Sequence, residues 1–160
     1  MSSRTDAFVS LSSTLTAFTE FHLLGTGMAK AYLAALDHVV GEDITDRLLE
    51  AFDDIPDGEE HERRKAIRAK ILGDEMLGDV ARALTKLWYS GTWFELPHRW
   101  SERFGPKPND TTFVVSPEAY VEGLLWKAIG AHPAGARAPG YGSWAAAPII
   151  PSFAGYRKHK

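Results

Sequence analysis

The sequence predicts an all-α fold: a small helical domain over residues 1–130, followed by an irregular Gly- and Pro-rich C-terminal arm over residues 131–160. Three observations lead to this prediction. Apolar residues recur at three-and-four spacing through much of the first 130 residues, which is the period of an amphipathic helix. Capping residues or Gly stand where these periodic segments begin and end. Gly and Pro then make up seven of the nineteen residues in "GAHPAGARAPGYGSWAAAP", so neither a helix nor a central strand can run through it.

The first 72 residues are predicted to form four helices. Two of them occupy residues 6–40, with a break near residues 25–27 where two Gly stand. The apolar positions that carry their period are Phe8, Leu11, Leu15, Phe18, Leu24, Met28, Leu33, Leu36 and Val40. Asp43 is expected to cap a third helix in "GEDITDRLLEAF". Asp57 is expected to cap a fourth helix in "IPDGEEHERRKAIRAKIL", with Glu60 completing a capping box.

The second half of the chain is predicted to hold two more helices. One lies in "DVARALTKLWYSGTWF" and ends near Gly91. Its apolar side carries Val80, Leu84, Leu87 and Trp88. Residues 93–115 hold three prolines and little periodicity, which predicts a long surface loop with a short extended piece at "TTFVV". Ser116 as cap and Pro117 at the first helical position give the clearest helix start in the chain, and this helix is expected to end at Gly130.

Composition excludes several classes of function. The chain has 160 residues, which suits one domain, and a formal net charge of -3, which argues against a nucleic acid partner because phosphate binding needs a basic face. The absence of Cys excludes disulfides, cysteinyl iron–sulfur clusters, thiolate nucleophiles and covalent c-type haem attachment. No run of about eighteen apolar residues exists, so no transmembrane segment is expected.

No stretch carries a recognisable catalytic, cofactor or metal site. "GTGMAK" begins like a dinucleotide fingerprint, but Lys30 occupies the third Gly position and no strand precedes it. Ser143 in "YGSWA" lacks the flanking glycines of a nucleophile elbow. "HERRK" places Lys65 where a zinc-binding helix needs its second His, and the six His form no ligand set. We therefore expect no catalytic residue, no cofactor and no metal in this chain.

Aromatic residues are the remaining candidates for function. Trp88 and Trp126 lie on the apolar sides of helices, so we expect them to contribute to the core. Tyr141 and Trp144 stand among Gly and Pro, where few apolar neighbours are at hand and many backbone groups need partners. They suit the surface of another protein, because aromatic anchors on extended segments are common in interfaces.

Two stretches resemble a known family. "LTKLWYSGTW" followed by "SPEAYVEGLLWKAIGAHPAGARAPGYGSWAAAP" is similar to the small, gamma subunit of bacterial FAD-dependent sugar and alcohol dehydrogenase complexes of the fructose, sorbitol and glucose dehydrogenase type. "FVSLSSTLTAF" and "AKAYLAAL" match the first helices of that family more loosely. The resemblance covers most of the chain, and its specific motifs lie in residues 84–94 and 116–148.

The resemblance implies a non-catalytic, chaperone-like subunit. In that family the large subunit carries FAD and the oxidising site, a multihaem cytochrome subunit with haem c is often a third component, and the small subunit assists folding, flavin incorporation, stability and export of the large one. Small subunits of the family commonly carry a twin-arginine leader, which "MSSRTDAFVSLSSTLTAF" does not resemble. A periplasmic location within a membrane-associated complex is expected if a leader has been removed, and a cytoplasmic one if Met1 is the native start.

The residues expected at the partner interface combine these motifs with the aromatic set. They are Trp88, Tyr89, Trp93, Tyr120, Trp126, His132, Pro133, Tyr141, Gly142 and Trp144. Two other interpretations remain open. The chain could be an independent small helical enzyme that uses a pocket near His98 or His132, with Asp110 or Glu118, or a helical adaptor for a partner outside redox chemistry.

Overall fold

Helices account for most of residues 3–133, the part of the chain that the computed structural model describes, which confirms the predicted helical character. The helices are α1 (Arg4–Thr16), α2 (Glu20–Gly25), α3 (Ala29–Val40), α4 (Glu42–Asp53), α5 (Glu60–Ile67), the π-helix η1 (Arg68–Leu72), α6 (Leu77–Ser90), α7 (His98–Phe104), α8 (Pro117–Val121) and α9 (Leu124–Ile129). The strands β1 (Thr92–Trp93) and β2 (Phe113–Val114) pair antiparallel, with Thr92 opposite Val114. The predicted arm lies almost wholly outside the described residues, so the division into domain and arm stays a prediction.

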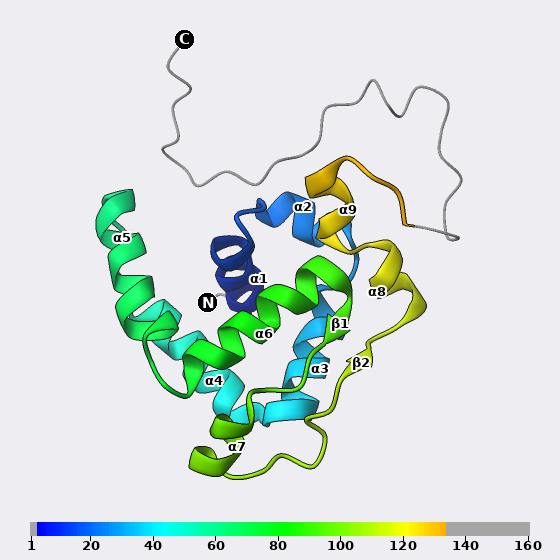
Figure 1. Cartoon of the computed structure of the whole chain (residues 1–160). Coiled ribbons are helices and arrows are strands. Elements are labelled where there is room, and N and C mark those ends of the chain that lie inside the picture. Colours follow the sequence, from blue (N-terminus) through cyan, green and yellow to red (C-terminus); the bar gives the residue numbers. More distant parts are fainter. Residues whose placement is uncertain (1–2, 134–160) are drawn as a thin grey trace.

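Helix α6 is the central element of the fold. Figure 1 shows it crossing the middle of the molecule, and it packs against α1, η1, β1, α9, α3 and α4. Trp88 of α6 is 1% exposed, with the ring of Tyr32 edge-on at a centroid distance of 4.7 Å and the ring of Phe8 at 6.2 Å. Gly91 ends the helix in the left-handed conformation, as the sequence predicted. The core is therefore built around one helix whose last turn is rich in aromatic residues.

The first predicted helix pair is three helices in the structure. Besides the expected break near residues 25–27, the chain turns at Ala17, whose φ of 62° is left-handed. Ser13 donates to the carbonyl of Phe18 at 2.7 Å, and the hydroxyl of Thr16 accepts from the amide of Phe18 at 3.3 Å. Thr19 then caps α2. Side-chain bonds to the backbone thus interrupt an apolar period that looked continuous.

Both predicted caps in the next two helices were wrong. Gly41, with a φ of 96°, is the N-cap of α4. Asp43 lies in the first turn, where its negative charge interacts favourably with the positive end of the helix dipole. Helix α5 begins after Glu59 without a side-chain cap, and Asp57 instead forms an ion pair with Arg63. The acidic residues therefore act through charge at these helix starts rather than by capping the backbone.

The predicted surface loop over residues 93–115 is an ordered, anchored segment. It contains α7 and β2, and only the expected extended piece at residues 113–114 is confirmed. Trp93 is 0% exposed and donates its indole N–H to Asp110 at 2.9 Å, and Trp100 is 1% exposed and donates to the carbonyl of Met76 at 2.9 Å. The two indole rings are buried and their N–H groups are hydrogen-bonded, which explains why this stretch packs against the core although its apolar residues show little periodicity.

The last predicted helix is divided in two. Ser116 caps α8 as expected, accepting from the amide of Ala119 at 3.1 Å, and Pro117 begins the helix. At Gly123 the chain passes so close to Tyr89 that a Cβ would lie 2.8 Å from the Tyr89 carbonyl oxygen. Helix α9 starts immediately after this contact and ends at Gly130 as predicted, with Gly130 in the left-handed conformation. The break allows α8 and α9 to fold over the end of α6.

Candidate partner-binding surface

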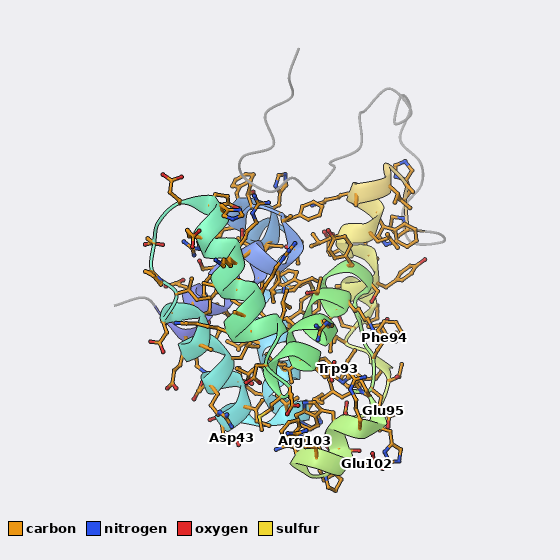
Figure 2. All side chains as sticks on the ribbon, turned by 60° about the vertical axis from the view of Figure 1, so that its left-hand side comes forward. Asp43, Trp93, Phe94, Glu95, Glu102 and Arg103 are labelled. Carbon is orange, nitrogen blue, oxygen red and sulfur yellow. The ribbon has the colours of Figure 1, made fainter. Side chains whose placement is uncertain are left out.

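Four large apolar side chains are exposed on two short helices at one end of the molecule. Phe21 and Leu24 of α2 are 83% and 57% exposed, and Leu125 and Ile129 of α9 are 41% and 57% exposed. Figures 1 and 2 both show α2 and α9 at the same end of the fold, next to the point where the described chain stops. We call these four residues the α2–α9 surface. Clustered exposure of this kind marks interaction sites more often than single exposed residues do.

The local sequences explain why these side chains face outward. In "EFHLLG" Leu23 is 0% exposed and anchors α2 to the core, so Phe21 and Leu24 lie on other sides of this short helix. In "LLWKAI" Leu124 is 0% exposed and plays the same part for α9, which leaves Leu125 and Ile129, one turn apart, on the outside. Each helix therefore packs one apolar side chain into the core and leaves others exposed to solvent.

Tyr89 of α6 anchors the turn between α1 and α2, next to this surface. Its hydroxyl donates to the carbonyl of Thr16 at 2.9 Å, and its ring meets the ring of Phe18 edge-on at 6.0 Å. Burial raises the pKa of Tyr89, so the phenol stays protonated and remains a donor. Because Tyr89 belongs to α6, these contacts fix the turn between α1 and α2 relative to the central helix.

Tyr120 and Trp126 hold the corner between α8 and α9. The indole of Trp126 donates to the carbonyl of Tyr120 at 2.8 Å, and the two rings are 5.5 Å apart and nearly perpendicular. Gly91 makes this corner possible, because a Cβ there would collide with the carbonyl of Ala119 in α8. The corner is therefore a rigid support for the outward face of α9.

A polar group borders the apolar side chains. His22 of α2 shares a hydrogen bond with the hydroxyl of Thr19 at 2.8 Å through Nδ1. Its ring lies edge-on to Phe18 at 5.9 Å and to Phe21 at 6.1 Å. The imidazole thus connects the buried ring of Phe18 with the exposed ring of Phe21.

The residues predicted at the interface fall into three groups. Trp88 and Trp93 are 1% and 0% exposed, so both belong to the core of the described structure, and their part in an interface stays a prediction. Tyr89, Tyr120 and Trp126 are half-buried and lie under the α2–α9 surface, while His132 is exposed and Pro133 buried directly after α9. Tyr141, Gly142 and Trp144 lie outside the described residues.

The sequence-based set missed the four residues of the α2–α9 surface. A signal was present, because "FHLLG" and "LLWKAI" place apolar residues around more than one face of a short helix. Elsewhere in the described chain, Phe94 and Val114 are also large, apolar and exposed, and Figure 2 shows Phe94 well below α9.

Three observations bear on the interpretation of the chain as an independent enzyme. Within 3–133 no group of three or more His, Asp or Glu is placed to hold a metal ion. The side chain of His98 is 84% exposed and lies 3.6 Å from Glu102 on α7, and Figure 1 shows α7 and α9 at opposite ends of the fold. Asp110 accepts from Trp93 and from the amide of Leu96, which is a structural role.

No described helix is long and apolar enough to cross a membrane. Comparisons of the chain with protein-family models, with curated proteins and with solved structures gave no significant match.

Proposed function

We propose that the chain is a non-catalytic subunit that binds a larger protein through the α2–α9 surface together with residues 131–160. The observation that carries this proposal is the exposure of Phe21, Leu24, Leu125 and Ile129 on one end of an otherwise well-packed domain. Four side chains alone are too few for a stable interface, which takes about 20–30 residues a side. The thirty residues that follow Gly130, with Tyr141 and Trp144 among them, supply the missing extent.

The identity of the partner rests on the sequence. The resemblance of residues 84–94 and 116–148 to small dehydrogenase subunits makes the partner the large FAD-containing subunit of a sugar or alcohol dehydrogenase, with a cytochrome c subunit as a further component of such complexes. The described parts of these two stretches are the last turns of α6 and the α8–α9 corner. In this proposal they support the interface, and α9 carries two of its four exposed apolar side chains, Leu125 and Ile129.

The proposed mechanism is mass action. A subunit that binds only the folded state of its partner stabilises that state, by about 2.7 kcal/mol when its concentration is about a hundred times the dissociation constant. A folded large subunit that persists longer has more opportunity to take up flavin. In this mechanism no proton or hydride passes through the small subunit, and the chain's own residues act by packing.

Co-expression tests the proposal. The chain is produced with and without the neighbouring reading frames, and flavin absorbance and dehydrogenase activity are measured in the purified material. We expect both only when the chain and a flavoprotein frame are present together. The double variant Leu24→Asp and Ile129→Asp should lose co-purification. The control Phe94→Asp and Val114→Asp, which adds the same two charges at 41% and 55% exposed apolar positions outside this surface, should keep it.

Two outcomes would sink the proposal. Turnover by the purified chain alone would favour the independent enzyme. A stable complex with a partner that carries no flavin would favour the helical adaptor.

A further inference from the structure

A groove of about 750 Å³ lies between the end of α1, α5 with η1, and α6. Its apolar floor is formed by Leu15, Phe18, Ile67 and Leu72, of which Phe18 and Ile67 belong to the core. We call it the α1–α5–α6 groove. Figures 1 and 2 show α5 and α9 on opposite sides of the α1–α2 junction, so the α5 side of this groove lies away from α9, while Phe18 and Thr19 line the groove next to α2. The proposed function does not use it.

The rim of the groove is strongly basic. The charged residues that line it are Arg63, Arg64, Arg68, Arg82, Lys86 and Glu60. Arg64 and Arg68 stand four residues apart along α5 and η1, and Arg82 and Lys86 stand four residues apart along α6. Side chains at this spacing are neighbours on one helix face, about 6 Å apart. Two pairs of cations therefore flank an apolar floor.

These cations are only partly neutralised. Arg63 pairs with Asp57, Arg64 lies 3.6 Å from Glu60, and Arg82 lies 3.5 Å from Asp79. Arg68 and Lys86 are exposed, and neither forms an ion pair with another residue of the described range 3–133. Each of these two belongs to a different side of the groove, so two charges face each other across the floor without a counterion from the described chain.

We infer that the α1–α5–α6 groove binds an acidic amphipathic helix of a partner protein. An amphipathic helix that lies in a groove inserts residues at i, i+3, i+4 and i+7 into the floor. The residues on either side of that stripe then face the two rims, where Asp or Glu would meet Arg68 on one side and Lys86 on the other. The charge around the floor thus specifies the sign of the charges that flank the ligand's apolar stripe.

Charge also decides against other occupants. Residues 134–160 of this chain contain Arg137, Arg157, Lys158 and Lys160 and no Asp or Glu, so their side chains offer no carboxylate to Arg68 or Lys86. Residues 1–133 carry fourteen Lys and Arg against twenty-one Asp and Glu, which disfavours a nucleic acid because a polyanion would meet a net negative body beyond the rim. An acidic segment of limited length, with apolar residues for the floor, fits both facts.

A fluorescent peptide tests this inference on the full chain. The probe is a helical peptide about 18 residues long, or roughly five turns, with a Leu stripe flanked by Glu, and its binding is followed by fluorescence anisotropy. One comparison peptide keeps the Leu stripe with Lys flanks, and another keeps the Glu residues with Ser in place of Leu. We expect the first peptide to bind at least about tenfold more tightly than either comparison, because only it matches both floor and rim.

Charge-reversal variants locate the binding. The double variant Arg68→Glu and Lys86→Glu should weaken binding of the Leu and Glu peptide at least about tenfold, and the loss should shrink at high salt. The control Lys30→Glu and Lys65→Glu makes the same change in net charge on exposed helix positions outside the groove, and should change binding less than about twofold.

Several results would overturn the inference. Equal affinity for the three peptides, equal weakening by the control variant, or no binding of the first peptide would each do so. Binding to phosphatidylglycerol vesicles that Arg68→Glu and Lys86→Glu abolish, without peptide binding, would assign the groove to an anionic lipid surface. A dimer in analytical ultracentrifugation that the same variant dissociates would assign it to a second copy of this chain.

Discussion

The substitution Phe21→Ser tests whether the α2–α9 surface contributes to partner binding rather than to the stability of the fold. Phe21 is 83% exposed, so the free energy of unfolding of the isolated chain should change by no more than about 0.5 kcal/mol. Complete burial of a Phe side chain is worth about 1.5 to 3 kcal/mol. If the partner covers the exposed four-fifths, the variant should lose about 1 to 2.5 kcal/mol of binding free energy, or roughly a five- to seventy-fold rise in Kd.

Urea unfolding of the isolated chain and biolayer interferometry against the large subunit measure the two quantities. Phe18→Ser, three residues earlier, is the contrast, because Phe18 is 2% exposed and its truncation should cost about 3 to 5 kcal/mol of stability. Val114→Ser is the control for binding. A Phe21→Ser variant that loses several kcal/mol of stability, or one that binds the large subunit as tightly as the unaltered chain, would refute the reasoning.

Two further substitutions test the support of the surface, and a third tests the ion pair between Arg4 of α1 and Asp37 of α3. Gly91→Val should cost at least about 2 kcal/mol in urea unfolding, because a β-branched residue is strained at a φ of 72°, and an unchanged midpoint would contradict the close packing on α8. Burial is the largest single influence on the pKa of Asp37 and raises it, but the hydrogen bonds from Arg4 at 2.6 and 2.7 Å, the hydrogen bond from Thr45 and the charge of Arg4 together lower the pKa below its usual value. The stabilisation by ionised Asp37 is therefore fully present above its usual pKa of about 3.9 and is lost as the pH falls through the lower pKa of the folded state. The difference in free energy of unfolding between the unaltered chain and Asp37→Asn should shrink below about pH 4. A difference that stays constant with pH would contradict the ion pair. Tyr89→Phe removes the bond to Thr16 and should cost about 1 kcal/mol in the same unfolding assay, whereas no loss would show that the ring alone holds the turn.

The features that were predictable from sequence depend on local chain chemistry. Ser116 and Pro117 mark the start of α8 because a hydroxyl cap and a missing amide donor act within one turn. Gly91 and Gly130 end helices in the left-handed conformation, which Gly adopts without a steric penalty. Signals of this kind need no knowledge of the rest of the fold.

The features that were missed depend on contacts between distant residues. The segment around Trp93 and Trp100 looked like a surface loop, since its indoles find their acceptors seventeen and twenty-four residues away, at Asp110 and Met76. The turn at Ala17 lies within a continuous apolar period and depends on several short side-chain bonds acting together. Periodicity alone carries neither kind of information.

For the candidate surfaces, too, some residues could be predicted from the local sequence and others only from the fold. The aromatic residues of the α8–α9 corner stood out in the sequence, but the exposure of Phe21 and Ile129 depends on how α2 and α9 pack on α1 and α6. The basic rim of the α1–α5–α6 groove joins residues from α5, η1 and α6, and only the fold brings them together. The roles of Tyr141 and Trp144 stay predictions.

Hydrogen exchange in the purified complex is the most direct test of the partner-binding account. The amides of residues 20–25 and 124–129, which form α2 and α9, are compared between the isolated chain and the chain bound to the large flavoprotein subunit. The account predicts slower exchange in both helices on binding, with little change in α7 at the other end of the molecule. Unchanged exchange in α2 and α9, with protection elsewhere, would contradict it.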